Sequence, residues 1–297
     1  MRYIIVLKRL FIISVLLSLA LARAGAQYDA SFAQYWDLEP YYNPAAAGKQ
    51  AKLNVAGAYA MSLTGFENSP KTMYVGADMP VYFLRNYHGV GVSLLNDQIG
   101  LFTHQRIALQ YAYKRKLFGG QISAGVQAGF ISEKFDGSDL DLAVGLYYTH
   151  GPWYAGVSMQ HVNSPLVNLG ETNELQVDAT YYFTGGYNIK LKNPFLSIHP
   201  SVLLRSDGSA FRADVTGRVL YTNDKKVMYG ALTYSPSNSV TVAVGGQFHG
   251  ITLGYSYEIY TSALSVGNGS HGLFVGYQTN IDLYKKGKNK HKSVRIL

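Results

Sequence analysis

The chain has 297 residues and a formal net charge of +8, and only 15% of its residues are charged, well below the roughly 25% of typical soluble proteins. Its 25 tyrosines and 31 glycines are typical of a β-protein with aromatic belts and closely packed strands. The absence of cysteine excludes disulfides, thiolate metal sites and a cysteine-anchored lipoprotein.

Residues 1–26 are predicted to be a secretory signal peptide. A basic start precedes an apolar stretch over residues 10–22 and the small-residue cleavage site Ala24-Gly25-Ala26, which makes Gln27 the expected mature N-terminus. The alternative is an N-terminal membrane anchor, for which the apolar stretch is short. Since no later run of 18 apolar residues exists, a membrane role of the mature chain requires strands.

Residues 27–50 are rich in aromatic residues and contain proline, without a clear period. We expect an ordered lead-in segment that plugs or caps the structure. Its aromatic residues Trp36, Tyr41 and Tyr42 favour a plugged lumen over an open pore.

Between residues 51 and 280, apolar and polar residues alternate with period two, as in strands that face two environments. In the clearest stretch, residues 121–130, Ile, Ala, Val and Phe lie on one face and Gln, Ser and Gly on the other. Most of the stretches have about the 9–12 residues that a tilted strand needs to cross a bilayer. There are fourteen: 53–59, 72–79, 90–94, 106–114, 121–130, 139–148, 153–160, 175–183, 196–205, 212–221, 227–231, 240–248, 251–259 and 273–277.

The even number of stretches predicts an all-β fold, a transmembrane antiparallel up-and-down β-barrel of about 14 strands. The charged strand residues share the face opposite the apolar one, and a lipid-facing Arg near the midplane costs about 2–4 kcal/mol. A soluble β-sandwich is the alternative, but it predicts more surface Lys and Glu. The charges expected to face inward are Asp78, Arg106, Asp141, Asp178, Arg205, Arg212, Asp214, Arg218 and Glu258.

The remaining charges are distributed unequally between the two rims. With both termini in the periplasm, the basic connections lie at the periplasmic rim and acidic loops face outward. Residues 281–297 form a basic periplasmic tail, predicted to dock an acidic partner through Lys285, Lys286, Lys288, Lys290 and Lys292, or else only to solubilise the chain.

Inside the barrel we expect a charge cluster of Arg205, Arg212, Asp214 and Arg218. An internal salt-bridge ladder is favoured over a solute filter.

No catalytic or phosphate-binding motif is present, and the eight histidines lack zinc-like spacing. A barrel hydrolase with His104, His161 or His271 at the outer rim, near Asp97, Asn163 or Asn268, is weighed against ordinary loop residues, which are favoured. We therefore expect no enzyme activity, no cofactor and no metal. An exported barrel rarely meets nucleic acid, so no such partner is expected despite the basic charge.

Four motifs follow one another along the chain: Phe32-Ala33-Gln34-Tyr35, the stretch Pro40–Gly48, Asn96–Gly100 and Gly254–Glu258. The first two resemble the opening, and the last two resemble later motifs, of the PorP/SprF family of the Bacteroidetes type IX secretion system. Glu258 occupies a position where the family usually has Asp. The matching positions are Gln34, Tyr35, Tyr42, Asn43, Pro44, Ala45, Gly48, Asp97, Gly100, Gly254, Tyr255 and Tyr257.

The resemblance implies a non-enzymatic outer-membrane component that supports secretion or surface anchoring of cargo proteins such as adhesins, with a link to gliding motility. The implied partners are outer-membrane lipid, the C-terminal domain of secreted cargo, and periplasmic ring or lipoprotein components. An outer-membrane porin or small-solute transporter is the alternative.

Overall fold

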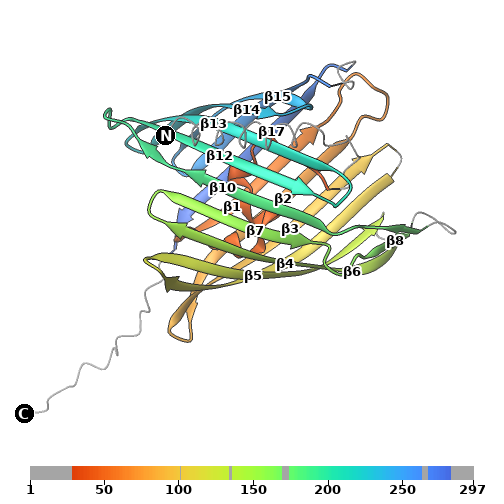
Figure 1. The fold of residues 1–297 in the computed structure, drawn as a ribbon, viewed down its shortest axis with the longest axis horizontal. Coiled ribbons are helices and arrows are strands. Elements are labelled where there is room, and N and C mark those ends of the chain that lie inside the picture. Colours follow the sequence, from red (N-terminus) through yellow and green to blue (C-terminus); the bar gives the residue numbers. More distant parts are fainter. Residues whose placement is uncertain (1–28, 101, 134–135, 169–173, 263–266, 282–297) are drawn as a thin grey trace, which may run out of the picture.

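A computed structural model describes residues 29–100, 102–133, 136–168, 174–262 and 267–281. These residues form a closed antiparallel β-barrel (Figure 1). The sheet has 15 strands, one of which, β11 (Ile189–Lys190), is a two-residue strand on the barrel wall; the other fourteen close through the β1–β17 and β10–β12 pairings. The predicted fold class is thus confirmed, whereas the predicted signal peptide and the lysines of the tail lie outside the described residues.

Each strand of the barrel pairs with its sequence neighbours in the ring, as in an up-and-down barrel. The fourteen strands are β1 (Lys52–Met61), β2 (Lys71–Phe83), β3 (Asn86–Ile99), β4 (Phe102–Leu117), β5 (Gly120–Glu133), β6 (Asp136–His150), β7 (Trp153–Gln160), β10 (Thr180–Tyr187), β12 (Leu196–Ser206), β13 (Phe211–Asn223), β14 (Lys226–Ser235), β15 (Ser239–Phe248), β16 (Ile251–Tyr260) and β17 (Ser270–Asn280).

The predicted strand over residues 175–183 is partly wrong. Its first residues belong to β9 (Glu174–Gln176), which pairs with β8 (Leu166–Asn168) in a separate hairpin, and the barrel strand β10 begins at Thr180. Val177 donates its N–H to the carbonyl of Pro165 and packs on Ile131. Asp178 is exposed and outside any strand, so its predicted inward position is also wrong.

The two ends of the barrel differ in their connections. We call one the short-turn end, because five of its connections have two residues: Leu84-Arg85, Phe118-Gly119, Gly151-Pro152, Asp224-Lys225 and His249-Gly250. In the first, second and last of these both residues have positive φ, the backbone of a hairpin turn that matches the strand twist. The opposite end, which holds the β8–β9 hairpin, is the long-loop end.

The two faces of the wall follow the predicted alternation. On β4 and β5 the outward side chains Leu109, Val126 and Phe130 are exposed, whereas the inward Gln110 and Gln127 are buried. Water cannot satisfy backbone groups in a bilayer, and a closed barrel pairs them all between strands. The outer face is therefore the lipid-facing surface.

A lipid-facing charge tests this assignment. Leu109 lies near the middle of β4, and Leu109→Arg is expected to reduce the free energy of unfolding by about 2–4 kcal/mol, because the guanidinium enters the hydrocarbon. Denaturant titration in lipid vesicles measures the change, with Leu109→Phe as the apolar control. Equal stability of the two variants would contradict a lipid-facing position.

Candidate functional site: a plugged barrel lumen

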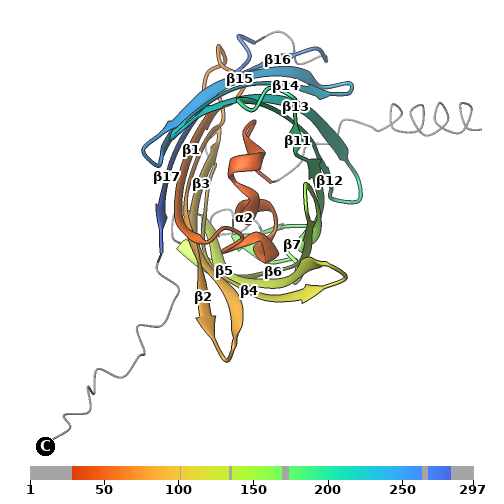
Figure 2. The same cartoon turned by 90° about the vertical axis from the view of Figure 1, so that its left-hand side faces the viewer.

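Residues 29–50 lie inside the barrel and form a plug, which Figure 2 shows in red to orange within the ring of strands. The plug contains three short helical turns, η1 (Tyr35–Asp37), α2 (Glu39–Tyr42) and η2 (Pro44–Ala46). No helix among the described residues is long and apolar enough to cross a membrane. The plug runs from the long-loop end, where Asp29 bonds to His161, to the short-turn end, where Gly48 bonds to Asp78 of β2.

Aromatic side chains fill the middle of the lumen. Tyr41 and Tyr42, at 1% and 0% exposure, pack edge to face with centroids 4.8 Å apart. Tyr41 also contacts Tyr74 of the wall at 5.2 Å, and Tyr42 contacts Tyr182 at 5.5 Å. Each such pair contributes about 0.5–1.5 kcal/mol beyond the burial of its area. Small wall residues leave room for these rings: Ala58, Ala60, Ala231 and Ala243.

Asn43 links the plug to the backbone of the wall. Its side-chain amide donates to the carbonyls of Leu146 on β6, at 3.0 Å, and Val157 on β7, at 3.1 Å. Its side-chain oxygen accepts the N–H of Ala45 at 2.9 Å and thereby caps η2. A buried amide must be bonded to be tolerated, and here both ends of the side chain are used.

Two glycines let the plug approach the wall closely. A Cβ at Gly145 of β6 would lie 2.1 Å from the side-chain oxygen of Asn43. Gly48 has φ +61°, and its Cβ would meet the carbonyl oxygen of Met79 at 2.7 Å. Glycine is therefore required at position 48 for two reasons: the backbone is left-handed there, and a Cβ would have no space.

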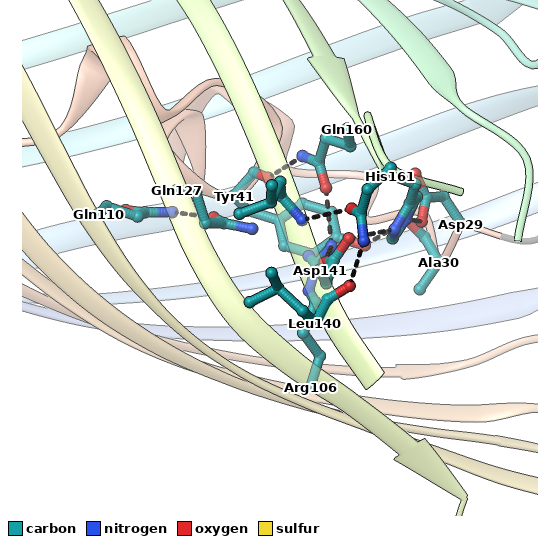
Figure 3. A network of polar contacts seen from close by, with 12 residues as sticks. Asp29, Ala30, Tyr41, Arg106, Gln110, Gln127, Leu140, Asp141, Gln160 and His161 are labelled. Carbon is teal, nitrogen blue, oxygen red and sulfur yellow. Dashed lines mark hydrogen bonds and ion pairs between the residues drawn. The ribbon is translucent and has the colours of Figure 1, made fainter. Parts of the chain in front are cut away.

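A buried ionic network fixes the start of the plug (Figure 3). The ring nitrogens of His161 lie 2.8 Å from Asp141 of β6 and 2.9 Å from Asp29, and Tyr182 donates to the second oxygen of Asp29 at 2.6 Å. Arg106 of β4 lies 3.6 Å from Asp141. All of these side chains are buried, and an imidazolium can donate to both carboxylates at once.

Gln160 extends this network to the turn α2. It accepts a hydrogen bond from Arg106 at 2.8 Å and donates to the carbonyl of Tyr41 at 2.5 Å. The guanidinium of Arg106 lies 5.4 Å from the ring centroid of Tyr41. The same residues thus hold both the start and the middle of the plug.

The charges of this network shift its titration. Burial lowers the pKa of His161, which follows β7, but the charge of Asp29 and hydrogen bonds to Asp141 and Asp29 outweigh burial and raise it to about 9. Burial raises the pKa of Asp29, yet the charge and hydrogen bond of His161 hold it well below its usual range. At neutral pH the pair is therefore ionised.

The predicted lumen charge cluster is present only in part as an ion-pair network. Arg212 bonds to Asp214 at 2.8 Å and to Glu258 of β16 at 2.9 Å. Arg218 instead lies over the ring of Trp36, 5.0 Å from its centroid. Arg205 is buried beside Arg212 in the β12–β13 register, without an ion pair among the described residues. The cluster contacts the plug and the wall.

Most family-motif residues meet at the same plug–wall interface. Tyr229 donates to Gln34 at 3.2 Å, a bond for which the adjacent Gly254 leaves space, and Tyr35 bonds to Ser201 at 2.8 Å. Pro44 and Ala45 form η2, and Tyr42 accepts the N–H of Phe32 at 3.0 Å.

The other motif residues lie in the wall or its connections, and Asp97 also lines a small cavity with Asp29 of the plug. Thr72 donates to Asp97 at 2.6 Å, and Gly100 has φ +63° at a connection of the long-loop end. Tyr255 bonds to His271 at 2.7 Å, and Tyr257 donates to the carbonyl of Asn268 at 2.9 Å.

Of the three rim histidines, His104 and His161 line one small cavity with Asp29 and Asp97, and His271 is not part of it. His161 lies between two carboxylates, His271 bonds to Tyr255, and His104 pairs in register with Asp97. In the described part of the chain, no group of three or more His, Asp or Glu side chains is arranged so that it could hold a metal ion.

Sequence reasoning missed the roles of Asp29, Gln160 and Tyr182. Arg106 and Asp141 were expected to face inward, and buried charges need partners of opposite charge. That requirement is the signal in the sequence that points toward His161. Asp29 carries no such signal, because the plug has no period from which a facing direction follows.

The network predicts a plug that loosens at alkaline pH. Because the folded pKa of His161 is raised, its stabilising effect is complete below its ordinary pKa of about 6.5 and is lost as the pH rises through about 9. Trp36 and Trp153 are the two tryptophans, so Trp153→Phe leaves the buried Trp36 as reporter of the plug. Acrylamide quenching of Trp36 is expected to rise between about pH 8 and pH 10.

The control is His161→Gln in the same background, in which quenching is expected to be higher at neutral pH and flat over this range. A rise of equal size in both proteins would show that another group titrates.

The comparisons with known proteins agree with the motifs. A family model described as type IX secretion system membrane protein PorP/SprF matches residues 24–277. A comparison with curated protein sequences finds no significant match. Similar solved structures include the KdgM porin, 7% identical over 75% of this chain and 98% of that chain with a TM-score of 0.38, and a mutant of the Rh. blastica porin, 7% identical over 76% and 99% with a TM-score of 0.35.

At such low TM-scores neither likeness carries an argument about this chain. The family match spans most of the sequence and confirms the resemblance drawn from its motifs. The chain belongs to the PorP/SprF family of type IX secretion system membrane proteins.

Proposed function

We propose that this protein is a non-enzymatic outer-membrane component of the type IX secretion system that supports secretion or surface anchoring of cargo proteins, such as adhesins, and docks periplasmic ring or lipoprotein components. The observation that carries the proposal is the bonded plug: a lumen occupied by buried Tyr41, Tyr42 and Asn43 suits a scaffold rather than a solute pathway. Family membership supplies the system in which it acts.

The connections support an orientation. Bacterial outer-membrane barrels have short periplasmic turns and longer external loops, so we place the short-turn end in the periplasm. The last described residue, Ile281, follows β17 at that end, which supports our proposal that the basic tail meets periplasmic partners and that the long-loop end meets cargo. A periplasmic position for both termini stays a prediction, since Asp29 lies at the long-loop end.

The tail is the part whose removal tests docking. Deletion of residues 281–297 is expected to leave the barrel inserted but to reduce recovery of periplasmic proteins on purification from native outer membrane, because five lysines are lost. Quantitative mass spectrometry of the co-purified proteins is the measurement. Recovery equal to that of the full chain would count against docking through the tail.

The porin alternative is separated by conductance. In planar bilayers the full chain is expected to show no steady open channel, because the plug is held by Asn43 and by the His161 network. A variant without residues 29–47 is expected to conduct, provided that heat-dependent gel mobility shows a folded barrel. Steady conductance of porin size in the full chain would favour the transporter.

A further inference from the structure

A cavity of about 830 Å³ opens at the short-turn end, between the end of the plug and strands β2 to β6. Its cationic lining residues are Lys49, Lys114 and Lys116, and none of its lining residues is acidic. Pro80 of β2 and Tyr87 of β3, which lie on the lumen-facing side of their strands, contribute apolar surface to the lining. The cavity therefore combines positive charge with apolar surface.

Lys114 is the least expected residue of this cavity. It lies on the lumen face of β4, is only 3% exposed, and has no hydrogen bond or ion pair to any described residue. The carboxylate of Asp78, two strands away, is bonded instead to the N–H of Gly48 at 2.7 Å and to Asn54 at 3.3 Å. The carboxylates of Asp78 and Glu39 thus offset the charge of Lys114 only at longer range, and an anion in the cavity would further reduce the cost of burying its ammonium.

The other two lysines differ from each other. Lys49 is neutralised by Glu39 at 2.8 Å and also bonds to Tyr147 at 2.9 Å. Lys116 is exposed and has no ion pair among the described residues. The surplus positive charge of the cavity thus comes from Lys114 and Lys116.

The position of these lysines decides between kinds of anion. Lys114 and Lys116 share the inward face of β4 with the buried Gln110 and Ala112, so they face the lumen and not the lipid headgroups. A free inorganic anion would leave the apolar lining unused, whereas a polypeptide supplies both a carboxylate and an apolar neighbour.

We propose that this cavity binds an acidic polypeptide segment of a periplasmic partner, with a carboxylate between Lys114 and Lys116 and an apolar side chain on Pro80 and Tyr87. The proposal rests on the proposed function, because that function places the short-turn end in the periplasm. It adds a specific site, distinct from the tail, and the chemistry of its ligand.

The test uses the full chain in detergent and a fluorescein-labelled octapeptide of alternating glutamate and leucine, with binding followed by fluorescence anisotropy. The double variant Lys114→Gln, Lys116→Gln is expected to weaken binding at least about tenfold, because charge-assisted contacts in the cavity are lost. The matched control is Lys225→Gln, Lys226→Gln, which removes the same charge from the β13–β14 turn at the same end and is expected to change affinity less than about twofold.

The proposal would be overturned by equal weakening in the two double variants, which indicates non-specific charge, or by equal binding of a peptide of alternating serine and leucine, which indicates apolar contact alone. Displacement of the peptide by inorganic phosphate at equal concentration would also overturn it, because that result indicates a simple anion site. So would binding about tenfold tighter after removal of residues 282–297, which indicates that the chain's own end occupies the cavity. Heat-dependent gel mobility verifies that each variant is folded.

Purification from native outer membrane separates this proposal from the function on which it rests. If the wild type retains periplasmic proteins and the Lys114, Lys116 double variant retains them equally, the cavity is not the site and the function stands. If the wild type retains none, the proposed function itself fails, whatever the cavity binds.

Discussion

The interaction on which the rest of the structure depends is the contact of Asn43 with the carbonyls of Leu146 and Val157. One side chain joins two adjacent wall strands to the plug, and Gly145 leaves it the space to do so. Because the aromatic rings of the plug pack on the wall from this fixed point, Asn43 sets the position of Tyr41 and Tyr42. The middle of the lumen is thus filled by side chains that pack on the wall or bond to it.

The lumen combines this apolar filling with charges that are mostly compensated. His161 lies between Asp29 and Asp141, and Arg212 between Asp214 and Glu258. Buried ion pairs add little net stability, but loss of one partner is costly, so such networks specify one arrangement of plug and wall. Lys114 and Arg205 depart from this rule among the described residues, and Lys114 does so at the short-turn end, where the cavity of about 830 Å³ opens.

The barrel could be predicted from the sequence because alternation reports the two environments of each strand directly. Gln121–Phe130 carried that pattern, and the structure places its Gln127 inward and its Val126 toward lipid. Alternation failed at residues 175–183, because the β8–β9 hairpin alternates as well and the pattern does not mark where one strand stops. The His161 network could not be predicted, since its partner Asp29 is 132 residues away in a segment without a period.

The place of the plug in the chain links two distant parts of the wall. The plug immediately precedes β1, and β1 pairs with the last strand, β17, so the ring has a seam between the first and last strands of the chain. Through Asn43 the same segment is bonded to β6 and β7, which lie five and six places from β1 in the ring of fourteen strands. The plug is therefore a noncovalent cross-link between a strand of the seam and the far side of the wall.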